Sequence, residues 1–101
     1  MIVVIGRVRC QPEEREALEG LLGTMQRESR EEDGCIAYGF FQSIEDPTEY
    51  VAVEEWESRE ALDAHFQQPH LAEFSAGLAK TVAAAPTIAF HEVVETTSPG
   101  G

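Results

Sequence analysis

The residues best suited to chemistry in this chain gather in one stretch, VEEWESREALDAHFQQPHLAEF, which runs from Val53 to Phe74. It contains the only tryptophan, two of the three histidines and two phenylalanines. The pKa of an imidazole lies near neutrality, so a histidine there can take up or release a proton, while aromatic rings can wall a dry pocket. The same residue types also suit a plain contact between a helix and a sheet. These residues alone leave both interpretations open.

Hydrophobic spacing predicts the elements that must position this stretch. Runs rich in β-branched and aromatic residues predict strands at 2–9, 35–43, 50–56 and 87–95. Apolar residues at helical spacing predict a helix from Pro12 to near Glu32, and Gly34 follows as a left-handed cap. Ser58 is placed to cap a second helix, which Pro69 interrupts, so that a further helical segment follows.

The order strand, helix, strand, strand, helix, strand predicts an α+β fold of the ferredoxin-like type, with the helices on one face of an antiparallel sheet. On the first strand, Val3 and Ile5 point to one side of the sheet and Ile2, Val4 and Val8 point to the other, so both faces of this strand are apolar. A chain of 101 residues has a small core and can cover one face only. We expect a homodimer that pairs through its sheets, one domain over residues 1–95, and a disordered tail over residues 96–101.

Charge and cysteine content limit the partners. Seven basic against 19 acidic residues give a formal charge of -12, which disfavours nucleic acid and anionic membranes and favours a neutral, apolar substrate. Cys10 and Cys35 form no CxxC pair, and the run that opens the chain has no basic leader and is too short to span a membrane. We therefore expect a cytoplasmic protein with free thiols.

The segments DGCIAYGFF and DPTEYVAVEEWESREALDAHFQQPH resemble the antibiotic biosynthesis monooxygenase domain family. The matching positions fall in order along most of the chain: Gly34, Cys35, Tyr38, Asp46, Pro47, Glu54, Trp56, Ser58, Ala61, His65, Pro69 and His70. The resemblance implies ferredoxin-like subunits that pair into a dimeric α/β barrel. Several members oxidise quinols or related aromatics with molecular oxygen and without metal or flavin, whereas others act on small signalling molecules, degrade haem or have no known reaction.

Such chemistry requires a base that turns an electron-rich substrate into an anion able to reduce oxygen, within a dry pocket. The resemblance implies His65 and Trp56 as the catalytic residues, facing one cavity. The expected substrate-binding residues share aromatic or polar character near this cavity: Tyr38, Phe40, Glu54, Phe66, His70 and Phe74. Glu54 shares a strand face with Trp56 and is expected to pair with His65.

No cofactor is expected. A metal site is disfavoured because His65 and His70 are five residues apart and do not lie on one helical face, while His91 lies on a distant strand. The chain contains no asparagine, although haem-degrading relatives and some cofactor-free ones use one in the pocket. Gln42, Arg7 or a backbone N–H would have to replace that amide donor. The alternative function is therefore a non-catalytic, small-ligand-binding or stress-related dimer on the same fold.

Overall fold

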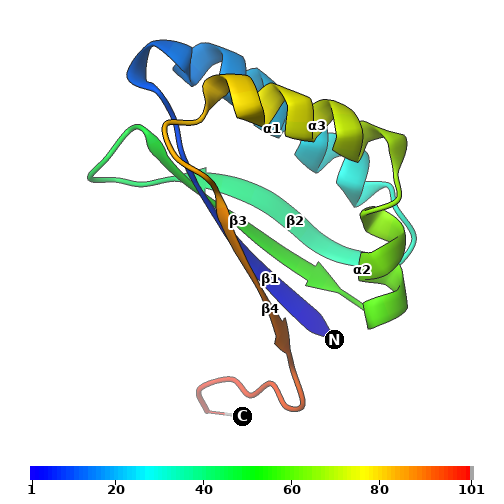
Figure 1. Ribbon diagram of the computed structural model, residues 1–101. Coiled ribbons are helices and arrows are strands. Elements are labelled where there is room, and N and C mark those ends of the chain that lie inside the picture. The colour runs from blue at the N-terminus through cyan, green and yellow to red at the C-terminus, as the bar shows by residue number, and fades with distance from the viewer. Residues whose placement is uncertain (101) are drawn as a thin grey trace.

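The computed structural model describes residues 1–100 (Figure 1). Its helices and strands follow one another in the order β1 (Ile2–Arg9), the 3-10 helix η1 (Pro12–Glu14), α1 (Arg15–Arg30), β2 (Cys35–Gln42), β3 (Glu49–Trp56), α2 (Arg59–His65), α3 (Pro69–Thr81) and β4 (Thr87–Glu92). The four strands form one sheet in the order β2-β3-β1-β4, in which all neighbours are antiparallel. The helices lie on one side of this sheet, which confirms the predicted ferredoxin-like α+β fold.

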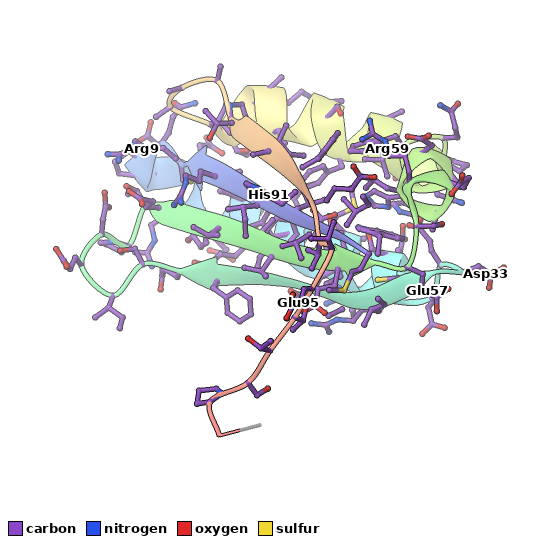
Figure 2. The ribbon with its side chains drawn as sticks, turned by 90° about the horizontal axis from the view of Figure 1, so that it is seen from below. Arg9, Asp33, Glu57, Arg59, His91 and Glu95 are labelled. Carbon is purple, nitrogen blue, oxygen red and sulfur yellow. The ribbon has the colours of Figure 1, made fainter. Side chains whose placement is uncertain are left out.

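Strand alternation divides the sheet into two different faces. On β1, Ile2, Val4 and Val8 are buried beneath the helices, whereas Val3 and Ile5 are half-buried on the opposite side. In Figure 2 the sheet is seen from below, with its strands side by side and the segment that carries Glu95 leaving it. The side of the sheet away from the helices thus carries these two aliphatic residues, as the sequence predicts, and also Glu55 and His91, which pair with Val3.

Three of the predicted element ends are wrong by more than one residue. The last strand is predicted to reach residue 95 but ends at Glu92, because its partner β1 begins at Ile2, which pairs with Glu92. Beyond this pair, one bond remains, from the Val93 N–H to the Met1 carbonyl at 2.9 Å. The first helix was expected to start at Pro12, but its first turn is the separate 3-10 helix η1. Gly34 has the expected left-handed conformation, with a φ of 85°, but the first helix ends at Arg30 with Glu31 as its cap, and Gly34 lies in the turn before β2.

The predicted interruption before Pro69 is also confirmed. Ser58 Oγ accepts a hydrogen bond from the Ala61 N–H at 3.1 Å and so caps the start of α2. This helix ends at His65, and α3 begins at Pro69, where proline needs no N–H partner. The turn between them brings the end of α2 and the start of α3 against the C-terminal end of α1 (Figure 1). The break thereby positions the two histidines of the chemical stretch.

Within residues 1–100, no helix combines the length and the apolar character needed to cross a membrane. Cys10 and Cys35 are both free. Burial raises the pKa of the Cys35 thiol to about 11, so it stays protonated and poorly nucleophilic at neutral pH.

Candidate active site

A cavity of about 150 Å³ lies between the covered face of the sheet and the helices α2 and α3. Its wall is largely apolar and aromatic, and three of its lining residues, Tyr38, Glu54 and His65, are buried and titratable. The other lining residues are Gly6, Arg7, Val8, Phe40, Ala52, Phe66, Leu71, Phe74, Leu78, Pro86, Thr87 and Ile88. An apolar cavity of about this volume holds one benzene ring.

The structure brings together six of the eight site residues expected from the sequence, and these six line the cavity: Tyr38, Phe40, Glu54, His65, Phe66 and Phe74. Phe66 is 40% exposed and packs on Phe90 of β4 with the ring centroids 5.8 Å apart, so it stands at the mouth. The remaining two, Trp56 and His70, do not border the cavity. Their rings are instead neighbours of the His65 ring, with centroid distances of 4.6 Å for Trp56 and 6.2 Å for His70.

Trp56 supports the site from within the core. Its side chain is fully buried and packs on His65 with the ring centroids 4.6 Å apart. Its Nε1–H donates to Glu54 Oε1 at 3.0 Å. The expectation that Trp56 faces the cavity is therefore wrong, because Leu62 of α2 and the rest of the core cover it at the end of β3.

Glu54 is a carboxyl group held in a nearly dry place. Its side chain is 4% exposed, and burial raises its pKa from 4.5 to about 7, although hydrogen bonds with Trp56 and Tyr38 oppose the shift. Burial also raises the pKa of the Tyr38 phenol far above its ordinary range. At neutral pH, Glu54 is thus an exchangeable acid in the cavity wall and Tyr38 is a neutral hydroxyl.

The sequence suggested that His65 pairs with Glu54, but in the structure His65 pairs with Glu32. His65 Nδ1 lies 3.0 Å from each carboxylate oxygen of Glu32, and the His65 side chain is only 2% exposed. Burial lowers the pKa of His65, while the Glu32 carboxylate acts in the opposite direction. Since Nδ1 donates to Glu32 in the neutral ring, Nε2 carries the lone pair. Within residues 1–100 no hydrogen bond engages Nε2, so His65 offers the cavity a base.

His70 continues this network on the side away from the cavity. Its Nε2 lies 2.9 Å from Glu32 Oε2, and its Nδ1 lies 3.2 Å from Glu28 Oε2. The first of these contacts lacks hydrogen-bond geometry, so the buried Nε2 has no hydrogen-bond partner within residues 1–100.

Glu32, His65 and His70 each bring one donor atom to within 4.8 Å of the others, and a set of two histidines and a carboxylate is one that zinc accepts. The reason given against a metal site therefore fails, because the two histidines lie on different helices and still converge. The His65–Glu32 pair is nevertheless already joined at hydrogen-bond distance. His70 joins this pair through an ion-pair contact of 2.9 Å to Glu32.

The sequence interpretation missed Glu28 and Glu32, which lie in the polar end of the first predicted helix. A usable signal was present, because the spacing of four residues places both carboxylates on one helical face directly before the cap predicted at Gly34. Of the expected substitutes for an amide donor, Arg7 borders the cavity and Gln42 does not. Gln42 Nε2 instead donates to the Pro47 carbonyl at 2.8 Å.

Comparison with known proteins places this chain in a family. Residues 1–77 match the sequence model described as "Antibiotic biosynthesis monooxygenase". The chain is 40% identical over 75 residues to "Putative monooxygenase Rv0793" of Mycobacterium tuberculosis. The aligned segment covers 74% of this chain and 73% of the relative. The solved structure of Rv0793 aligns with a TM-score of 0.88 and 31% identity, covering 96% of this chain and 98% of that one.

Two further relatives match this chain over longer segments than the 75 residues of Rv0793. "Probable quinol monooxygenase YgiN" of Escherichia coli is 31% identical over 86 residues, covering 74% of this chain and 82% of the relative. The protein sll1783 of Synechocystis is 34% identical over 95 residues, which is 94% of this chain but spans 65% of that relative's length. By its sequence match and its fold, the chain belongs to the antibiotic biosynthesis monooxygenase family.

Proposed function

We propose that the chain is a cofactor-independent monooxygenase that oxidises a small, quinol-like aromatic with molecular oxygen. The observation that carries this proposal is the aromatic cavity of about 150 Å³ that His65 lines, with Nδ1 of that histidine taken by Glu32. The size suits one aromatic ring, and the free ring nitrogen suits a base. The name of the relative YgiN supports a quinol as the substrate class.

In the proposed reaction, the substrate O–H bond breaks and its proton goes to Nε2 of His65. The resulting anion is electron-rich and reduces oxygen inside a site that excludes water. A quinol can supply all the electrons that dioxygen needs, through oxidation to the quinone level and insertion of one oxygen atom into a ring C–H bond. The other oxygen atom leaves as water. Depression of the pKa of His65 by burial keeps the base neutral and ready at neutral pH.

Glu54 takes the place of the missing amide donor in this proposal. Its pKa of about 7 leaves part of the population protonated at neutral pH, and it lines the same cavity as His65. A protonated carboxyl can donate a hydrogen bond to an oxygen atom on which charge develops. Trp56 acts as a positioning residue, because it holds Glu54 through Nε1 and packs on the His65 ring.

Oxygen consumption with a panel of benzoquinols and naphthoquinols tests the proposal, in buffer with a metal chelator and with spontaneous oxidation subtracted. We expect enzyme-dependent uptake with at least one quinol. With labelled dioxygen, one labelled atom should appear in the product and the other in water. Failure of all quinols, or transfer of the label entirely to hydrogen peroxide, would contradict a monooxygenase.

The second candidate is a non-catalytic binder of small aromatic ligands. It is favoured by the absence of asparagine from the chain, which leaves the cavity without the amide expected for a catalytic member. Saturable binding of a quinol or quinone, without oxygen uptake in any member of the panel, would select this function. The aromatic walls are expected to bind in either case.

A further inference from the structure

A row of alternating histidine and glutamate side chains extends from the cavity to the protein surface. It begins at His65, passes through Glu32 and His70, and ends at Glu28, with N···O distances of 3.0, 2.9 and 3.2 Å. The side-chain exposure rises in the same order, from 2% to 9%, 17% and 49%. The members come from α1, the residues after it, the end of α2 and the start of α3. The row therefore crosses the protein from a dry interior to solvent.

The two ends of this row open on different spaces. His65 lines the aromatic cavity. Glu28, Glu32 and His70 line a surface hollow of about 420 Å³, whose other lining residues are Glu31, Asp33 and Gln68. Figure 2 shows Asp33 at the outer edge of the molecule. The cavity does not share a lining residue with this hollow, so the row itself is the connection between them.

Glu32 and His70 lie at hydrogen-bond distance without a hydrogen bond between them, and this arrangement suits proton transfer. We assign the proton of the neutral His70 ring to Nδ1, which lies 3.2 Å from Glu28 Oε2, so that Nε2 carries a lone pair. This Nε2 is buried and without a hydrogen bond, although Glu32 Oε2 lies 2.9 Å away. Two acceptors facing each other at this distance become a hydrogen-bonded pair once the carboxylate gains a proton.

We propose that Glu32, His70 and Glu28 form a proton-release chain that links the base His65 to solvent. The proposal rests on the proposed function of His65. When Nε2 takes the substrate proton, the Nδ1–H bond breaks and an O–H bond forms on Glu32. That O–H bond breaks as His70 Nε2–H forms, and His70 Nδ1–H passes a proton to Glu28 and water. When the Nε2–H bond then breaks to supply a proton to the oxygen atom that leaves as water, the same steps in reverse return a proton from solvent to Nδ1, and the base is reset.

Other titratable groups near the row do not belong to it. Glu54 and Tyr38 face His65 from the strands, but Glu54 is bonded to Trp56. Glu31 and Asp33 share the hollow, yet within residues 1–100 neither has an ion pair with a histidine. Glu31→Gln is therefore a matched control, since it removes one carboxylate from the same hollow without touching the row.

The first test needs no substrate. Nitrogen-15 NMR of the imidazoles at pH 8 should show His65 with its proton on Nδ1, and Glu32→Gln should abolish this preference while Glu31→Gln retains it. A proton on Nε2 of His65, or a tautomer unaffected by Glu32→Gln, overturns the chain at its first link. A spectrum that changes when a chelator is added also overturns it, in favour of a bound metal. This measurement tests the proton-release chain even if no quinol is oxidised.

The second test separates release from chemistry in an active preparation. His70→Gln should leave the first turnover near the wild-type rate and slow steady-state turnover by about tenfold in weak buffer, with recovery when imidazole is added as a mobile proton carrier. Glu28→Gln should show the same pattern more weakly, and Glu31→Gln should match the wild type. Equal slowing of the first and later turnovers, or no slowing in any buffer, overturns the proposal.

Discussion

The two faces of the sheet show how one set of strands serves two purposes. On β3, Glu54 and Trp56 point to the covered face and are joined by a hydrogen bond, whereas Val51 and Val53 lie on the bare face. On the covered face, helices supply partners for buried polar groups, so acids and a histidine can be tolerated there. On the bare face no helix of residues 1–100 lies above the strands, and Val53 is paired there with Ile5 of β1, while Glu55 and His91 flank Val3. In this sheet the buried carboxyl group of Glu54 occurs on the face where a second layer completes its surroundings.

The largest effect should come from the base on the covered face. We expect His65→Gln to lower the quinol oxidation rate by about 10²- to 10⁴-fold, because the variant keeps much of the volume but removes the proton acceptor. The rate should be measured per folded molecule, since loss of the Glu32 contact also costs about 1–3 kcal/mol of stability. A rate within about threefold of the parent, with a lowered melting temperature, would assign His65 to packing alone.

The bare face should in turn be the dimer interface. We expect a particle of twice the 11.1 kDa subunit mass in light scattering, with well over about 1,200 Å² of total buried area. Val53→Asp should weaken the dimer by at least about 100-fold, because an unpaired charge would be buried at the interface. Val53→Leu is the matched control and should remain dimeric. An 11.1 kDa particle from the parent protein at micromolar concentration would refute this use of the face.

Glu54 and its neighbour Glu55 allow the two faces to be compared at adjacent positions. Because burial raises the pKa of Glu54 from 4.5 to about 7, its contribution to stability is full below pH 4.5 and is lost as the pH rises through 7. As the pH rises from 5 to 8, the free energy of unfolding of Glu54→Gln should therefore increase by about 2–3 kcal/mol relative to that of the parent.

The measurement for this pair is urea unfolding across that pH range. His65 acts in the opposite direction, because its pKa is lowered and its stabilising contribution is lost as the pH falls below 6.5. That contribution is common to parent and variants. Glu55→Gln, on the half-buried opposite side, should keep the pH dependence of the parent. Equal profiles for Glu54→Gln and the parent would show that Glu54 is ionised normally.

The smallest effect should come from the hydrogen bond between Trp56 and Glu54. Trp56→Phe keeps an aromatic ring but loses the donor, so it should cost about 1 kcal/mol more at pH 8, where Glu54 is ionised, than at pH 5. In a Glu54→Gln background this difference should vanish. A pH-independent cost in both backgrounds would mean that Trp56 contributes packing only.

Local rules were sufficient for the elements and for much of the cavity wall. The β-branched runs, the left-handed glycine at position 34 and the break before Pro69 predicted the order of elements, because each depends on a few neighbouring residues. Alternation along β2 and β3 then placed Tyr38, Phe40 and Glu54 on one face, where they line the cavity. The ends of β4 and of the first helix were misjudged, since they depend on where a partner strand or a first turn stops.

The sequence by itself determined which face each strand residue occupies and where the second helix breaks, because these follow from backbone periodicity and from the missing N–H of proline. Only the tertiary structure decided that His65 meets Glu32, that His70 turns toward the same carboxylate, and that Leu62 covers Trp56. These contacts join segments far apart in the chain, and their partners depend on how α2 and α3 dock against α1. No local periodicity specifies that docking, since it results from packing the whole covered face at once.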